Sequence, residues 1–173
     1  MIQTLCLAVT LAAAAPPAPL PEPLQKLALP QAHVPLENLL SSGQISKEQM
    51  LALRDLGYTA FISLRPATEE GTGWEEALAG QEGLRFIRIP IAGADDLTRE
   101  NAERLGQGIA AAGTGKTAVF CASGNRVGAL LALKAHTLDG LDAEASLDLG
   151  LKAGLTRLEP SVRSLLGLPG KKP

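Results

Sequence analysis

The chain has 173 residues, within the range of about 100 to 200 residues that one domain usually spans. Apolar residues make up 46% of it and aromatic residues 3%, so we expect a core built mostly of Leu, Ala, Ile and Val. The formal charge is −2 and the pI is near 5.7. Domains that bind nucleic acid usually carry a clustered basic excess, so this composition argues against a nucleic-acid partner.

The first fifteen residues, MIQTLCLAVTLAAAA, have the pattern of a signal peptide, with an apolar stretch followed by small residues at the expected cut. No Lys or Arg precedes the apolar stretch, and Pro16 would follow the cut directly. An N-terminal tail is therefore the alternative. The stretch is shorter than the roughly 20 apolar residues of a membrane-spanning helix, so we expect no stable membrane span. The signal predicts export to the periplasm or the medium.

The chain after this signal is expected to form one domain with short flanks. Residues 16–33 contain PPAPLPEPL, and a Pro-rich composition is typical of an extended linker. Residues 34–167 form the predicted domain, and residues 168–173 a tail.

Helical and strand patterns alternate from residue 46 onward. Ser46 and Gln49 predict a capping box at the start of a helix, and Gly57 its end. The alternation predicts an α/β fold of three layers, αβα, with a small, mostly parallel central sheet. In such sheets, functional sites form at the carboxyl ends of the strands. The expected strands are 58–64, 84–89 and 117–120, and the expected helices are 46–57, 73–83, 98–112, 127–136 and 142–154, with a last short helix opening at Glu159 and Pro160.

Cys121 is the only cysteine outside the predicted signal. An internal disulfide is therefore impossible, and a lone thiol in an exported protein needs an explanation. Burial as a small hydrophobic side chain is one explanation. The chain after the predicted signal also contains only His33 and His136, without the close spacing of metal ligands, so we expect neither a metal nor a cofactor.

The stretch FCASGNRVG, residues 120–128, gives Cys121 a second explanation. Four residues separate Cys121 from Arg126, and so short a turn between strand and helix directs backbone N–H groups inward as an anion-binding nest. Thiolates are stabilised at helix N-termini near Arg, and a guanidinium binds an oxyanion through two parallel hydrogen bonds. We therefore expect Cys121 to be a nucleophile. The expected anion-binding residues are Ala122, Ser123, Gly124, Asn125, Arg126 and Val127.

Three stretches of the sequence resemble the phosphatase-like domain family found in the beta-lactamase hydrolase-like proteins. They are CASGNRVGALLA, GQISKEQMLALRDLGYTAFISLRP and LDLGLKAGLTRLEPSVR, and the similarity extends over residues 34–167. That family belongs by fold to the dual-specificity and tyrosine phosphatase superfamily, and some of its members are described as sulfurtransferases. The resemblance implies a cysteine-dependent phosphatase-like hydrolase, with the Cys loop at the centre of a parallel sheet flanked by helices.

The loop departs from the signature of active tyrosine phosphatases. That signature has five residues between Cys and Arg, a preceding His, and Ser or Thr after Arg. Here four residues intervene, and the flanking residues are Phe120 and Val127. A loop of this length resembles that of rhodanese-type sulfurtransferases, so sulfur transfer through a Cys121 persulfide is an alternative. A non-catalytic oxyanion-binding module and a thiol sensor are further alternatives.

Asp95 and Asp96 are the expected general acid, as a pair whose members the sequence does not distinguish. They lie in IPIAGADD, about as far before the nucleophile as the acid of the dual-specificity enzymes lies before theirs. An Asp pair before Thr98 would also suit a helix N-terminus. Arg65, at the carboxyl end of its strand, either reaches the rim of the site around Cys121 or lies on the surface. The substrate is expected to be an anion that contains phosphate or sulfur, and the sequence indicates neither its identity nor an oligomeric state.

Overall fold

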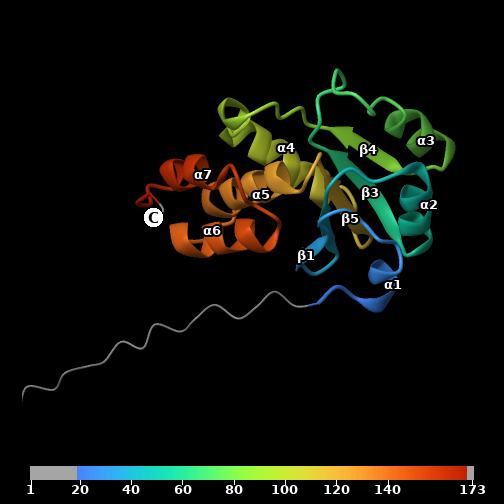
Figure 1. The fold of residues 1–173 in the computed structure, drawn as a ribbon, viewed down its shortest axis with the longest axis horizontal. Helices are drawn as coiled ribbons and strands as arrows, with labels where there is room; N and C mark the ends of the chain where they lie inside the picture. The colour runs from blue at the N-terminus through green and yellow to red at the C-terminus, as the bar shows by residue number, and fades with distance from the viewer. Residues whose placement is uncertain (1–18, 171–173) are drawn as a thin grey trace, which may run out of the picture.

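The computed structural model describes residues 19–170 of the chain. In that part, seven α-helices and one short 3-10 helix surround a sheet of five strands (Figure 1). The strands are β1 (His33–Leu36), β2 (Leu39–Ser42), β3 (Tyr58–Ser63), β4 (Arg85–Arg88) and β5 (Lys116–Phe120). The helices are α1 (Glu22–Gln25), α2 (Lys47–Asp55), α3 (Glu75–Gln81), η1 (Ala94–Asp96), α4 (Arg99–Ala110), α5 (Asn125–Thr137), α6 (Ala143–Lys152) and α7 (Glu159–Leu165).

The sheet has the strand order β1-β2-β5-β3-β4. Strand β5 pairs in parallel with β2 on one side and β3 on the other, and β4 pairs in parallel with β3. Only β1 runs antiparallel, in a hairpin with β2 whose turn contains Asn38 with φ of 61°. The prediction of a small, mostly parallel sheet between helices is confirmed. As a result, the carboxyl ends of four strands meet at one edge of the sheet.

Alternate residues of the strands pack into two separate cores, one on each face of the sheet. Val119 and Ile62 point into the core shared with α4 to α7, whereas Phe61 and Phe120 point into the core shared with α1 to α3. Figure 1 shows these two groups of helices on opposite sides of the sheet. The side-chain period of two along a strand explains the division.

The expected helices and strands from residue 46 onward are all present, with ends that differ by a few residues. The capping box at Ser46 and Gln49 is formed, with the Gln49 N–H donating to Ser46 Oγ over 3.2 Å. The hydroxyl of Thr98 caps α4 by accepting from the N–H of Asn101. These side-chain acceptors satisfy N–H groups that have no partner inside the helix, and so define where each helix begins.

The segment before the first strand differs from the extended linker expected at 16–33. Residues 22–25 form α1, and Leu24 and Leu29 are buried with 5% and 8% of their surface exposed. Both side chains belong to the core that contains Phe61. The packed part of the chain therefore begins before residue 34, because Leu24 and Leu29, which lie among the prolines, bury their side chains in the core. The predicted signal peptide at 1–15 lies outside the described residues.

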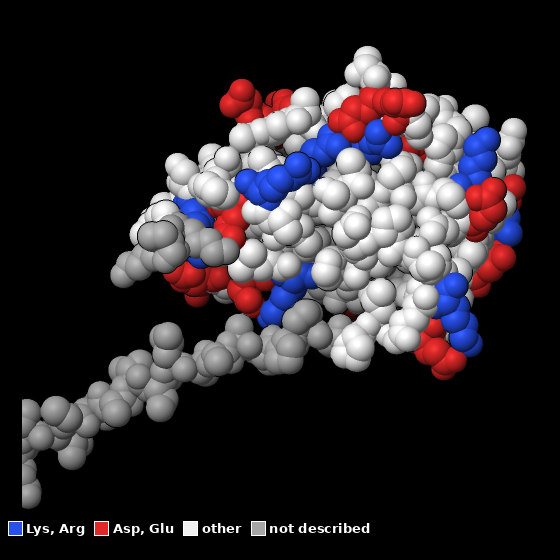
Figure 2. Space-filling model, viewed as in Figure 1, with Lys and Arg blue, Asp and Glu red and all other residues white. Residues whose placement is uncertain are grey.

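Positive and negative side chains lie next to one another around a broad uncharged area on the face shown in Figure 2. This mixture is consistent with the near-neutral charge of the sequence. Within residues 19–170, no helix has the length and apolar character needed to span a bilayer.

Candidate active site

Cys121 lies at the carboxyl end of the central strand β5. Its N–H donates to the carbonyl of Ser42 over 3.2 Å, and the carbonyl of Phe120 accepts from the N–H of Leu64 over 2.9 Å. These two bonds hold the residue between the ends of β2 and β3. The side chain of Cys121 is fully buried and packs in the core that also contains Val127.

The turn from Cys121 into α5 depends on Gly124. Its φ of 78° lies in the left-handed region that favours glycine, and its carbonyl accepts from the N–H of Gly128 to begin the helix. Helix α5 follows directly at Asn125. The first N–H groups of a helix have no acceptor inside it, which leaves its N-terminus partially positive. This end of α5 lies beside Cys121.

Arg126, in the first turn of α5, is fixed by two neighbours. Its Nη1 donates to Glu69 Oε1 over 2.5 Å and to the carbonyl of Ile91 over 2.7 Å, and its Nη2 donates to Glu69 Oε2 over 3.0 Å. The pKa of Arg126 is raised chiefly by the hydrogen bond with Glu69, and further by Coulombic attraction and a hydrogen bond involving the nearby Cys121 side chain. Arg126 and Cys121 are therefore adjacent, as their places at the two ends of the loop require.

The pairing with Glu69 leaves one edge of the Arg126 guanidinium available. A guanidinium has five N–H donors in a fixed plane. Both hydrogens of Nη1 and one of Nη2 are used by Glu69 and Ile91. Within residues 19–170, no oxygen accepts from the Nε–H or from the second Nη2 hydrogen, and a hydrogen bond with the Cys121 side chain also raises the pKa of Arg126. The Nε–H and this Nη2 hydrogen form a side-on pair that can bind two oxygens of a tetrahedral anion. The carboxylate thus orients the arginine without filling this edge.

Glu69 links Arg126 to Arg65 at the end of β3. Arg65 Nε donates to Glu69 Oε2 over 2.7 Å, and its Nη1 donates to Gln44 Oε1 over 2.8 Å. The bond with Arg126, assisted by the bond with Arg65, lowers the pKa of Glu69 to about 2. Arg65 therefore lies at the rim, in contact with the residue that holds Arg126.

A second cluster of charged residues, Glu75 and Arg88, contacts the backbone near Arg65. Glu75 is fully buried and accepts from Arg88 Nη2 over 3.2 Å and from the N–H of Gly73 over 2.7 Å. Arg88 also donates to the carbonyl of Arg65 over 2.8 Å. Buried charges of this kind are retained only where partners satisfy them, so the cluster fixes the backbone that carries Arg65 and Glu69.

Sequence reasoning did not identify Glu69, Gln44 or Glu75 as parts of this region. Glu69 follows Arg65 by four residues in the loop PATEE, a spacing that signals a pair only when the local backbone is known. The pairing between Arg126 and Glu69 spans 57 positions. No local pattern in the sequence indicates such a contact.

The loop that carries Asp95 and Asp96 begins beside Arg126, because the carbonyl of Ile91 accepts from that arginine. Asp96 Oδ2 accepts from the N–H of Ala92 over 2.6 Å and from that of Gly93 over 3.3 Å. Its carboxylate thus closes the 3-10 turn of η1. Asp95 is exposed, and its carboxylate accepts no hydrogen bond from residues 19–170. The two aspartates, which the sequence could not distinguish, therefore differ in the structure: the Asp96 carboxylate is hydrogen-bonded and the Asp95 carboxylate is not, as far as the described residues are concerned.

The side chains of the other loop residues have different surroundings. Ala122 is exposed, Ser123 is half-buried, and Val127 is fully buried in the core. Asn125 Oδ1 accepts from the N–H groups of Thr156 and Leu158 and from the Thr156 hydroxyl, over 2.9 to 3.2 Å. Its side chain thus ties the loop to the connection between α6 and α7. Any contribution of Asn125 or Val127 to an anion site would come from the backbone N–H.

Neither histidine lies among the contacts of Cys121. His136, in the last turn of α5, has Nδ1 at 3.1 Å from the carbonyl of Leu141. Burial lowers the pKa of His33, on β1. Across residues 19–170, no three His, Cys, Asp or Glu side chains are grouped so that they could hold a metal ion.

Comparison with solved structures identifies proteins of the same fold, although no family model and no curated protein sequence matches the chain. A DUF442 protein from Shewanella putrefaciens CN-32 has a TM-score of 0.63 and 19% identity, over 86% of this chain and 94% of its own. TpbA of P. aeruginosa has a TM-score of 0.58 and 21% identity, over 83% and 91%. Human DUSP28 has a TM-score of 0.53 and 16% identity, over 88% and 95%.

The chain therefore has a fold of the dual-specificity and tyrosine phosphatase type. This confirms the fold that the sequence resemblance implied. At 16 to 21% identity, the likeness establishes the fold alone, because one fold can carry unrelated chemistries. Function must therefore be inferred from the residues at the carboxyl ends of the strands.

Proposed function

We propose that the protein is a cysteine-dependent phosphatase-like hydrolase, with Cys121 as nucleophile and Arg126 as the oxyanion-binding residue. The observation that carries this proposal is that Arg126, held by both carboxylate oxygens of Glu69, lies beside Cys121 at the N-terminus of α5. A phosphoryl group bound there would have two oxygens on the guanidinium and others on the loop N–H groups. TpbA has been solved in complex with pTyr, and this supports an aryl phosphate as the first substrate to test.

The reaction would proceed in two balanced steps. The Cys121 thiolate attacks phosphorus, and an S–P bond forms as the P–O bond to the leaving group breaks. Asp95 gives its proton to the departing oxygen. Water then attacks the phosphocysteine, Asp95 accepts the proton of that water, and inorganic phosphate leaves as the thiolate is restored. We assign the acid role to Asp95 because the Asp96 carboxylate is used by the N–H groups of Ala92 and Gly93.

The four-residue spacing between Cys121 and Arg126 favours one alternative, a rhodanese-like sulfurtransferase. In that reaction, Cys121 would take the outer sulfur of thiosulfate as a persulfide and release sulfite. Cyanide would then remove the sulfur as thiocyanate and regenerate the thiol. Neither Asp95 nor Asp96 would be needed for this transfer.

One purified sample tests both reactions. Release of p-nitrophenol from p-nitrophenyl phosphate and formation of thiocyanate from thiosulfate and cyanide are measured side by side, with Cys121→Ser as the blank. We expect phosphate release that Cys121→Ser abolishes. Thiocyanate formation without phosphate release would favour sulfur transfer instead. Absence of both, with phosphate still bound, would leave an oxyanion-binding module.

Arg126→Lys tests the anion site separately from turnover. Lysine keeps the charge but cannot reproduce the planar pair of donors, so vanadate binding should weaken by about 10-fold or more. Arg157→Lys is the matched control, because Arg157 is exposed. Equal vanadate affinity in the Arg126→Lys variant and the control would assign Arg126 a purely structural role.

A further inference from the structure

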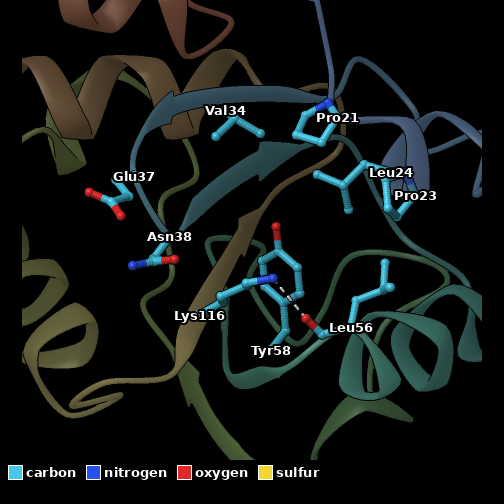
Figure 3. Close-up of a pocket in the computed structure, with 9 residues that line it drawn as sticks. All are labelled: Pro21, Pro23, Leu24, Val34, Glu37, Asn38, Leu56, Tyr58 and Lys116. Carbon is cyan, nitrogen blue, oxygen red and sulfur yellow. Dashed lines mark hydrogen bonds between the residues drawn. The ribbon is translucent and has the colours of Figure 1, made fainter.

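Figure 3 shows a pocket of about 250 Å³. It lies where strands β3 and β5 begin, whereas Cys121 follows the last residue of β5. It is lined by Tyr58, the first residue of β3, and Lys116, the first residue of β5. At roughly 3.3 Å per strand residue, Lys116 is about 17 Å from Cys121 along β5. The pocket is therefore separate from the proposed active site. Its apolar wall is formed by Pro21, Pro23, Leu24, Val34 and Leu56.

The hydroxyl of Tyr58 is directed into this pocket without a partner. Tyr58 is 4% exposed, and in Figure 3 its ring stands in the middle of the pocket with the oxygen pointing toward Val34, Pro21 and Leu24. No residue between 19 and 170 forms a hydrogen bond with that oxygen. Burial raises the pKa of Tyr58, so the phenol remains protonated and can donate. No buried side-chain oxygen or nitrogen of the described residues lacks a hydrogen-bond partner, so the Tyr58 oxygen is accessible within the pocket. It can therefore donate to an acceptor that enters the pocket.

Lys116 adds a positive charge beside the same ring. Its Nζ donates to the carbonyl of Leu56 over 2.9 Å and lies 5.6 Å from the centre of the Tyr58 ring. An ammonium group has three hydrogens to donate, so two remain. Within the described residues, no carboxylate pairs with Lys116. Glu37 also lines the pocket, but it is exposed and its carboxylate points away from Tyr58 in Figure 3.

We propose that this pocket binds a small apolar carboxylate, whose head accepts from Tyr58 and Lys116 and whose body packs against the prolines and leucines. A carboxylate is the expected head group because the pocket offers two hydrogen-bond donors, Tyr58 and Lys116, and a positive charge without a paired carboxylate among the described residues. The rest of the ligand is expected to be apolar because the pocket wall is made of prolines, leucines and a valine. The size follows from the volume of about 250 Å³, which lies just below the roughly 300 to 1,000 Å³ of clefts that hold drug-sized ligands.

Isothermal titration of the full chain with 4-phenylbutyrate, and with 4-phenylbutan-1-ol as its neutral counterpart, tests the proposal. We expect the acid to bind at least about 10-fold more tightly than the alcohol, since a charge-assisted bond is lost with the carboxylate. Tyr58→Phe keeps the ring and should weaken acid binding by about 3- to 10-fold. Lys116→Met should remove most of the preference for the acid. Lys47→Met is the matched control, because Lys47 is exposed and does not line the pocket, and it should bind as the unaltered chain does.

Several results would overturn the proposal. The first is that 4-phenylbutyrate does not bind at several millimolar. The second is that the acid and the alcohol bind equally well. The third is that Tyr58→Phe binds the acid with unchanged affinity. A nuclear magnetic resonance spectrum of the unaltered chain, with the Tyr58 ring labelled, keeps the test independent of how the variants fold. The ring signals should shift on addition of 4-phenylbutyrate. Contacts between the ring and protons of residues 1–18 in the free protein would instead show that the chain fills its own pocket.

Discussion

Arg126 and Glu69 form a two-pronged ion pair in which the two carboxylate oxygens accept from Nη1 and Nη2 of the guanidinium, and Cys121 is close enough to Arg126 to raise its pKa. The carbonyl of Ile91 fixes the remaining hydrogen of Nη1. An arginine on a flexible stem loses side-chain entropy when it binds an anion. Because Glu69 already holds Arg126 in place, part of that cost is met before substrate arrives.

Removal of the Glu69 charge should therefore impair anion binding although Glu69 itself would repel an anion. We expect Glu69→Gln to lower kcat/KM for p-nitrophenyl phosphate by about 10-fold, because a misplaced positioning group typically costs that much or more. Glu70→Gln is the matched control, since Glu70 is the exposed neighbour with the same charge. A higher kcat/KM in Glu69→Gln than in Glu70→Gln would show that Glu69 blocks the site.

The same pair should make stability depend on acid pH. The pKa of Glu69 is about 2, below its ordinary value of 4.5, so its stabilising contribution is complete above pH 4.5 and is lost as the pH falls toward 2. Urea unfolding at pH 6, 4 and 2.5 should show the unaltered chain more stable than Glu69→Gln at pH 6. This difference should shrink at each lower pH. A constant difference across the three values would contradict the assignment.

Asp95 and Asp96 should respond differently to removal of their charges. Asp95→Asn should slow hydrolysis of phenyl phosphate on the order of 10²-fold, as is typical when a general acid is lost, with little change in stability. The loss should be smaller for p-nitrophenyl phosphate, whose leaving group needs less protonation. Asp96→Asn should destabilise the η1 turn by about 1 kcal/mol and leave the rate near normal. The reverse pattern would transfer the acid role to Asp96.

The contact between α5 and α6 predicts a sharp difference between two helical glycines. A Cβ at Gly128 would overlap the backbone of Gly150 and Leu155, so Gly128→Ala should lower the free energy of unfolding by about 1 to 3 kcal/mol. Gly80 lies in α3 with nothing within 4 Å of the added carbon. Gly80→Ala should be neutral or stabilising by about 0.5 to 1 kcal/mol. Chemical denaturation of both variants checks the pair.

The parts of this structure that the sequence predicts are those governed by local rules. Ser46 and Thr98 mark helix starts because the signal and its partner lie three residues apart, and Cys121 is recognisable because strand, turn and helix follow one another directly. The β1–β2 hairpin escapes this reasoning. Its strands have four residues each. Pro35 interrupts β1, whose sequence HVPL does not alternate apolar and polar residues although its burial does alternate. Strand β2 is buried along its whole length.

The site illustrates the same limit. Glu69 reaches Arg126 only because the loop after β3 folds over the end of β5, and Asn125 meets Thr156 across 31 positions. Such contacts depend on the assembled sheet. The sequence predicts that Asn125 contributes to a nest of backbone N–H groups and does not indicate where its side chain lies. The side chain binds the connection that leads to α7. A loop motif identifies the backbone conformation better than it identifies where each side chain points.

Whether Cys121 carries a phosphoryl group during turnover can be measured directly. The protein is mixed with p-nitrophenyl phosphate, quenched in denaturant within milliseconds, and its mass and peptide fragments are determined. We expect a fraction of the chains to be heavier by one phosphoryl group, located on the peptide that contains Cys121 and absent in Cys121→Ser. Phosphate release at the same rate with no adduct on Cys121, or with turnover retained in Cys121→Ser, would contradict this expectation.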